Sequence, residues 1–127
     1  MSFMKFNCDD KFYRAVRPDG IFIKPNGCIS SAAFKSSNGC SVDYGYGRTD
    51  EEAATFMLRK LNGNVFCFYF QDCLDKDIFV NYEPIEGPEE DKNPYHCGLY
   101  KNPMLEKMTS GQCKHLSNVA KMVSVSS

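Results

Sequence analysis

Hydrophobic residues in the first third of the chain come in short runs separated by turn-forming residues. The runs at 12–16 and 21–24 are strand-like, and an Arg-Pro-Asp-Gly turn separates them. The runs at 28–34 and 40–43 flank Asn38-Gly39, a pair that readily supplies the positive φ of a tight reversal. The pattern therefore predicts four short strands, of which the last two form a β-hairpin.

Two helices are predicted from capping boxes that precede apolar residues at one-face spacing. In Thr49-Asp-Glu-Glu52 the side chain of each end residue can accept a hydrogen bond from the backbone N–H of the other. The residues that follow predict a helix over 50–61, which an Asn-Gly pair ends. Thr109-Ser-Gly-Gln112 predicts a second helix over 110–123 in the same way.

Three further strands are expected between these helices. The run 65–70 holds apolar residues without alternation, which favours a central strand covered on both faces. The segments 78–82 and 93–100 are also strand-like, and the acidic stretch 84–92 between them contains proline and glycine and is expected to be a surface loop. The aromatic segment 44–47 is expected to be a flexible link.

These elements predict one α+β domain over 1–127, a mostly antiparallel sheet of about five or six strands with two helices packed against it. The tail after about residue 123 is expected to fray. The predicted core consists of apolar residues from the strands and from both helices: Phe34, Val42, Met57, Leu58, Phe66, Phe68, Phe70, Val80, Leu99, Leu116, Val119 and Val123.

The composition is that of an ordinary globular protein. Of the 127 residues, 43% are hydrophobic and 24% are charged, and the net charge is −1, so nothing points to nucleic acid as a partner. No apolar run approaches the roughly 20 residues of a membrane span, and the first residues lack the features of a signal peptide. The sequence therefore predicts a cytoplasmic protein that binds an anionic small molecule or another protein.

The seven cysteines are expected to be free thiols. Their number is odd and no export signal accompanies them, whereas secreted disulfide frameworks normally pair all their cysteines. Cys28 and Cys40 flank the predicted hairpin turn, a geometry that permits a disulfide. No Cys-x-x-Cys pair is present, and Cys113 and His115 would supply only two ligands, so neither a metal site nor a cofactor is predicted.

Five polar residues are candidates for a ligand pocket. Arg14 lies within an apolar strand, where an arginine either reaches solvent or holds a carboxylate or phosphate. Ser31, Ser41 and Asp43 lie on the predicted hairpin beside residues that must be buried, so they need partners in the protein or in a ligand. His96 is the candidate catalytic residue, because a histidine can donate or accept a proton near neutral pH.

Each candidate also has a structural alternative. Arg14 can be a surface arginine, and the adjacent Ser30 and Ser31 would point to opposite faces of a strand, so only one of them can face a pocket. Asp43 can cap the turn that follows it, and His96 can be a structural residue at a strand entry. The sequence contains no nucleophile elbow and no glycine-rich phosphate loop, so no motif names a reaction.

The same residues resemble the layout of a group of small bacterial proteins. That group shares an arginine followed by Ser-Ser-Ala-Ala-Phe, Ser-Val-Asp and Asn-Pro-x-His-Ala segments, which match Arg14, 30–34, 41–43 and 93–96 here. Cys97 stands where the group favours alanine. The resemblance covers most of the chain and implies a bacterial, cytosolic protein, but it implies no particular reaction.

The first predicted strand is also similar to the entry strand of arginine-type ADP-ribosyltransferase toxins, which begins with a Tyr-Arg pair before an Arg-Pro-Pro turn. The matching residues are Tyr13-Arg14 and Arg17-Pro18. In that family the arginine orders a nicotinamide-nucleotide pocket, and a Ser-Thr-Ser strand and a Glu-x-Glu loop complete the site. Here Ser30-Ser31 would stand for the serines, whereas Glu89-Glu90 are the nearest acids and do not form the motif. The chain is also short for that fold.

Two functions of different class follow from these observations. The first is a domain that binds an anionic small ligand or nucleotide, with or without catalysis, in a pocket lined by the five candidates. The second is a non-enzymatic interaction module, of the accessory or immunity type found in bacterial conflict systems, which binds a protein through Tyr44, Tyr46, Tyr95 and the acidic loop. A concave pocket shared by Arg14, His96 and a serine would favour the first function, and a flat aromatic patch would favour the second.

Overall fold

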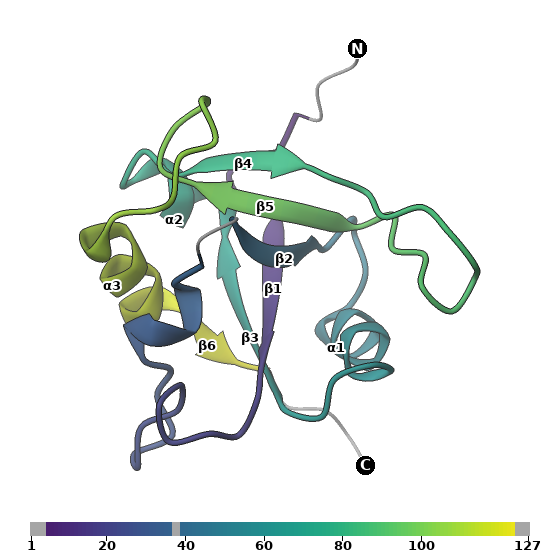
Figure 1. The fold of residues 1–127 in the computed structure, drawn as a ribbon, viewed down its shortest axis with the longest axis horizontal. Helices are drawn as coiled ribbons and strands as arrows, with labels where there is room; N and C mark the ends of the chain where they lie inside the picture. Colours follow the sequence, from purple (N-terminus) through teal and green to yellow (C-terminus); the bar gives the residue numbers. More distant parts are fainter. Residues whose placement is uncertain (1–4, 37–38, 124–127) are drawn as a thin grey trace.

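The computed structural model describes residues 5–36 and 39–123, and within these ranges six antiparallel strands form one sheet (Figure 1). In chain order the strands are β1 (Lys11–Val16), β2 (Cys40–Tyr44), β3 (Asn64–Tyr69), β4 (Phe79–Tyr82), β5 (His96–Tyr100) and β6 (Lys121–Met122). Their order across the sheet is β4-β5-β2-β1-β3-β6. The helices are α1 (Asp50–Leu58), α2 (Phe70–Leu74) and α3 (Ser110–Val119), with a 3-10 helix η1 (Ser31–Phe34). The predicted α+β class is confirmed.

The sheet opens between β1 and β2. Strand β1 pairs with β3 along its whole length, but it pairs with β2 only at Phe12–Tyr44 and Tyr13–Asp43. Beyond Tyr13 the two strands diverge, and Figure 1 shows β1 and β3 running at a large angle to β2, β5 and β4. The next residue of β1 is Arg14, which therefore lies at the mouth of the opening.

The two faces of the sheet have separate cores. Phe12, Phe66 and Phe68 belong to the larger cluster, which also includes buried residues of η1, α2 and α3. Tyr13 and Val65 point to the opposite face, where they pack with the buried alanines of α1. Because adjacent residues of β3 are buried in different cores, the unalternating apolar run is explained, and the prediction of a strand covered on both faces is confirmed.

Most of the predicted core is buried. The buried members are Phe34, Val42, Phe66, Phe68, Val80, Leu99, Leu116 and Val123, and the partly buried ones that pack in the same cores are Met57, Leu58, Phe70 and Val119. Both predicted capping boxes are present at the starts of α1 and α3. These helices end earlier than predicted, at Leu58 and Val119, and the chain after α3 turns back as β6, where Val123 N donates to Val65 O at 2.8 Å.

The predicted hairpin is wrong. Residues Ser31–Phe34 form η1 instead of a strand, and the segment 21–24 takes part only in an isolated bridge between Ile23 and Ile29. Strand β2 pairs with β1 at Asp43 and Tyr44 and with β5 at Cys40–Asp43, and not with residues 28–34. Asn38 of the predicted turn lies outside the described residues. Helix α2 was also missed, because its first residue ends the apolar run that predicted β3.

All seven cysteines are free thiols, as predicted. Cys8 and Cys28 are exposed, whereas Cys40, Cys73, Cys97 and Cys113 are buried. Loss of solvation raises the pKa of Cys40 to about 11 and that of Cys97 to about 12. These buried thiols therefore stay protonated at neutral pH and act as small apolar core residues rather than as nucleophiles.

Candidate functional site

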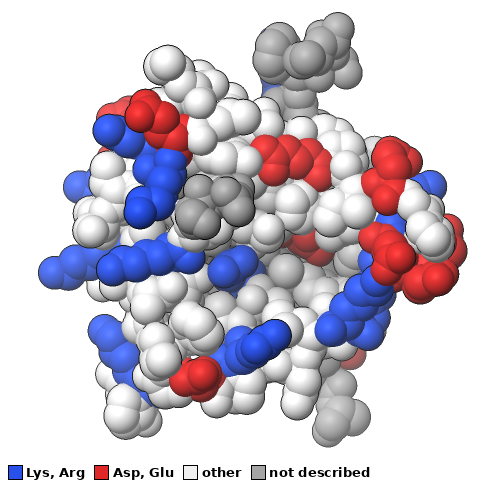
Figure 2. All heavy atoms as spheres, viewed as in Figure 1, with Lys and Arg blue, Asp and Glu red and all other residues white. Residues whose placement is uncertain are grey.

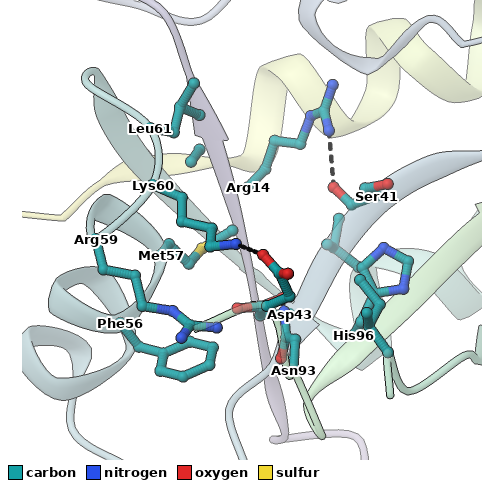
Figure 3. A pocket seen from close by; sticks show the side chains of 14 residues that line it. Arg14, Ser41, Asp43, Phe56, Met57, Arg59, Lys60, Leu61, Asn93 and His96 are labelled. Carbon is teal, nitrogen blue, oxygen red and sulfur yellow. Dashed lines mark hydrogen bonds and ion pairs between the residues drawn. The ribbon is translucent and has the colours of Figure 1, made fainter. Parts of the chain in front are cut away.

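A cavity of about 240 Å³ lies where β1 and β2 diverge (Figure 3). Strands β1, β2 and β5 line one side of it, and α1 with the loop before β5 lines the other. Four of the five predicted site residues line this cavity: Arg14, Ser41, Asp43 and His96. Ser31 does not line it, because it begins η1 instead of lying on a strand beside Ser41.

The strand register explains this convergence. Ser41 pairs with Gly98 and Asp43 pairs with His96 across β2 and β5. Since alternate residues of a strand face the same side, Ser41, Asp43 and His96 share the face that looks toward α1. Val42, between the two β2 residues, is buried on the opposite face in the larger core.

Arg14 anchors the opening of the sheet. Its Nε donates to Ala33 O at 3.0 Å and its Nη1 donates to Ser41 O at 2.8 Å, so the half-buried side chain ties β1 to both η1 and β2. It forms no ion pair with any carboxylate of residues 5–36 and 39–123. Two of its five N–H donors are used by these carbonyls, and within the described residues the remaining donors on Nη1 and Nη2 have no hydrogen-bond acceptor.

Asp43 is buried at the base of the cavity, with 3% of its surface exposed. One carboxylate oxygen accepts a hydrogen bond of 2.8 Å from Asn93 Nδ2, so the side chain bonds the loop before β5 and not the turn that follows β2. Loss of solvation raises the pKa of Asp43. The Asn93 bond and the nearby positive or polar groups of Arg48, His96 and Arg59 lower it, but the effect of burial is larger. A buried carboxyl with a raised pKa is a second candidate for proton transfer beside His96.

Asp43→Asn should show the cost of burying this charge as a pH-dependent difference in stability. A carboxyl whose pKa is higher in the folded than in the unfolded protein binds more protons when folded, so wild-type stability falls as pH rises from the ordinary value of 3.8 through the raised one. Asparagine does not titrate and can still accept the bond from Asn93. Measured from about pH 4 to about pH 7, the melting temperature of the variant minus that of the wild type should increase. A difference that is constant or shrinks with pH would contradict this account of Asp43.

The tautomer of the neutral His96 ring follows from its hydrogen bond. Its Nδ1 lies 2.8 Å from Glu83 O, which can only accept, so Nδ1 carries the hydrogen. The neutral ring therefore has its lone pair on Nε2, and this nitrogen is the one that can accept a proton or a ligand hydrogen bond. His96 thus has a structural contact at Nδ1, and its Nε2 has no hydrogen-bond partner within residues 5–36 and 39–123.

Sequence reasoning missed the contribution of α1 and of the loop before β5. Arg59 donates to Glu90 O at 3.2 Å and to Lys92 O at 2.6 Å, and its guanidinium lies 4.0 Å from the centre of the Phe56 ring. Lys60 forms an ion pair with Asp91. These contacts hold the acidic loop against the end of α1 and close one side of the cavity. The only sign of this contact in the sequence was that the predicted helix has two basic residues near its end and that a later loop is acidic.

The tyrosines of the alternative hypothesis lie next to one another, since the ring centres of Tyr44 and Tyr46 are 5.7 Å apart and those of Tyr46 and Tyr95 are 6.5 Å apart. Tyr46 is 67% exposed, but Tyr44 and Tyr95 are half-buried. The Arg48 guanidinium lies 3.5 Å from the centre of the Tyr95 ring, and the Phe56 ring packs edge-on against the same residue. Tyr95 therefore helps to position the loop before β5.

One group in the described part of the chain has the donor atoms for a metal ion. Ligand atoms of Asp72, Asp75 and His115 lie within 4.8 Å of one another, between α2 and α3. Both carboxylates already accept protein hydrogen bonds, from Tyr69 N and from Gln71 Nε2, and His115 Nε2 bonds Asp72 O. These elements do not line the cavity described above.

Among the helices of residues 5–36 and 39–123, none has the length and apolar character needed to cross a lipid bilayer. No known protein family matches the chain, and no curated protein or solved structure is significantly similar to it.

Proposed function

We propose that this protein binds a small anionic ligand, such as a sugar phosphate or nucleotide, in the cavity between β1, β2 and α1. The observation that carries the proposal is the convergence of Arg14, Ser41, Asp43 and His96 on one cavity from three different strands. A concave site with a few converging polar groups and a carboxyl of raised pKa is the usual form of a small-molecule site.

The charge distribution supports placing the anionic group of the ligand at Arg14. A second cavity, of about 350 Å³, lies on the other side of this residue and is also lined by Arg17 and Lys35. No carboxylate of the described residues lines that second cavity. In Figure 2 basic atoms gather on the side that carries α3 in Figure 1, while acidic atoms gather over the loop before β5, and a recess lies between them. Arg14 can thus offer its remaining N–H donors to a phosphate or carboxylate at the more positive end of the recess.

The rest of the cavity suits an uncharged portion of the ligand. Met57, Leu61 and Ile85 contribute apolar surface, and Lys60 is already paired with Asp91. At the base, Asp43 and His96 are the groups able to exchange a proton with the ligand, and they lie side by side in the β2–β5 register. If the bound molecule reacts, these two residues are the proposed acid–base pair.

The surroundings of Arg14 differ from those expected from the resemblance to arginine-type ADP-ribosyltransferases. The serine beside the entry-strand arginine is Ser41 on β2, whose carbonyl accepts the Arg14 bond, and not Ser31. The residues Glu89-Glu90 lie in the loop that Arg59 holds against α1. Because the Arg14 bond uses the backbone carbonyl of Ser41 and not its hydroxyl, the proposal of a nucleotide ligand rests on the lining of the cavity and not on this resemblance.

Isothermal titration calorimetry with ribose 5-phosphate tests the proposal. The wild-type protein should give a saturable, one-to-one signal that weakens as the salt concentration rises, whereas neutral ribose should bind much more weakly. Ser41→Phe places a strand-compatible ring at an exposed position of the cavity wall and should abolish the signal while leaving the protein folded. Absence of binding to the wild type, or undiminished binding to the filled variant, would overturn the proposed site.

A further inference from the structure

The second cavity, of about 350 Å³, lies on the side of the sheet that carries η1. Its wall includes Ala33 of the larger core and Phe22, which packs against that core. Three residues line both this cavity and the first one, between β1, β2 and α1: Arg14, Ala15 and Leu61. Because the two cavities meet at these residues, a ligand in the first cavity can extend past Arg14 into the second.

Basic side chains are the only charged groups of the described residues that line the second cavity, and they are Arg14, Arg17 and Lys35. Arg17 and Lys35 are exposed, and neither forms an ion pair or a side-chain hydrogen bond within residues 5–36 and 39–123. In contrast, the lining of the first cavity includes Asp43 and Asp91. Cations that line one cavity repel one another, and an anion bound among them lowers this repulsion. The second cavity is therefore suited to an anionic group.

The guanidinium of Arg14 lies where the two cavities meet. Strand alternation places Arg14 on the same face of β1 as Phe12, which is buried in the larger core on the η1 side. Its Nε donates to Ala33 O, in the wall of the second cavity, and its Nη1 donates to Ser41 O, in the wall of the first. In Figure 3 the guanidinium points away from Asp43. The remaining donors of this side chain are thus on the more positive side of the site.

We propose that the ligand is a nucleoside diphosphate, whose terminal phosphate binds in the second cavity, where Arg17 and Lys35 attract it. The inference rests on the proposed function and narrows its ligand class from phosphates in general to diphosphates. The phosphate next to the nucleoside lies at Arg14, and the nucleoside lies in the first cavity, beside Asp43 and His96. A single phosphate carries about two negative charges at pH 7, whereas three positive side chains line the second cavity. A second phosphate therefore matches the charge of the site better than one phosphate does.

Isothermal titration calorimetry with ADP, AMP and inorganic pyrophosphate tests this inference at low salt, where attraction between charges is least screened. The wild type should bind ADP about tenfold more tightly than AMP, because only ADP has a phosphate for the second cavity. Arg17→Gln and Lys35→Gln should each weaken ADP binding about fivefold and change AMP binding less than about twofold. Pyrophosphate should bind more weakly than ADP, because it leaves the first cavity empty. Lys24→Gln removes an exposed cation that lines neither cavity, so this matched control should alter none of the affinities.

Each outcome decides the inference. Equal wild-type affinities for ADP and AMP, or unchanged ADP binding by both variants, would overturn it and leave the anion site at Arg14 intact. Equal losses of ADP and AMP binding in the variants would also overturn it, because Arg17 and Lys35 would then attract any anion and not a second phosphate. Pyrophosphate binding as tight as that of ADP would contradict a nucleoside in the first cavity. Failure of the wild type to bind ribose 5-phosphate and both nucleotides would remove the proposed function itself.

Discussion

Replacing Arg14 with glutamine is expected to weaken the binding of ribose 5-phosphate about a hundredfold. Removing a guanidinium from a recessed anion site costs roughly 2–5 kcal/mol, and each 1.4 kcal/mol is a factor of ten in affinity. The side chain also donates to Ala33 O and Ser41 O, so the free energy of unfolding should fall by about 1–3 kcal/mol. Calorimetry and chemical denaturation measure the two effects separately.

Two further variants separate the roles of Arg14. Arg14→Lys keeps the charge but loses the planar fork, so it should recover part of the affinity and little of the stability. Lys76→Gln removes a positive charge from an exposed turn after α2 and is the control for net charge. If Arg14→Gln destabilises the protein yet binds ribose 5-phosphate as the wild type does, Arg14 is only an anchor between strands.

Gly63→Ala is expected to lower the free energy of unfolding by about 3 kcal/mol, near the upper end for added volume at a packed site. A Cβ at this position would overlap the carbonyl oxygen of Val16 and lie 2.8 Å from its carbonyl carbon. Both are backbone atoms of β1, which cannot rotate away as a flexible side chain does. Relief would require β1 and β3 to separate where Val16 pairs with Asn64.

Thermal unfolding of the purified variant measures this effect, and a drop in melting temperature of about 10 °C corresponds to the expected loss. Gly20→Ala is the matched control, because a Cβ there would meet no atom within 4 Å and the residue has no positive φ. A small change for Gly63→Ala, similar to that of the control, would show that the chain between α1 and β3 is not packed against β1 as described.

The elements marked by local signals were predictable from the sequence. The capping boxes of Thr49 and Thr109 and the apolar run of β3 depend on residues adjacent in the chain, and they appear where expected. The hairpin failed for the opposite reason. Asn38-Gly39 is a strong local turn signal, but the pairing of β2 with β1 and β5 is decided by residues far apart in sequence.

The candidate site divides in the same way. Arg14, Ser41, Asp43 and His96, which line one cavity, were chosen as candidates because polar residues stood among strand residues. Strand alternation places three of them, Ser41, Asp43 and His96, on one face. Ser31 was misplaced with the hairpin. Arg59 and Lys60 were missed, because only the fold brings the end of α1 against the acidic loop.

The width of the cavity depends on the angle at which β1 and β2 diverge. Residues that do not line the cavity can act on this angle. The two halves of the sheet meet at Phe12–Tyr44 and Tyr13–Asp43, and just beyond this junction Gly45 N donates to Lys11 O at 2.8 Å. A side chain on Gly45 would press against the same Lys11 carbonyl, at 3.0 Å, and so act on the angle between the half-sheets. Under the proposed function, a larger residue in place of Gly45 would change the size of ligand that the cavity accepts, although every cavity-lining residue is retained.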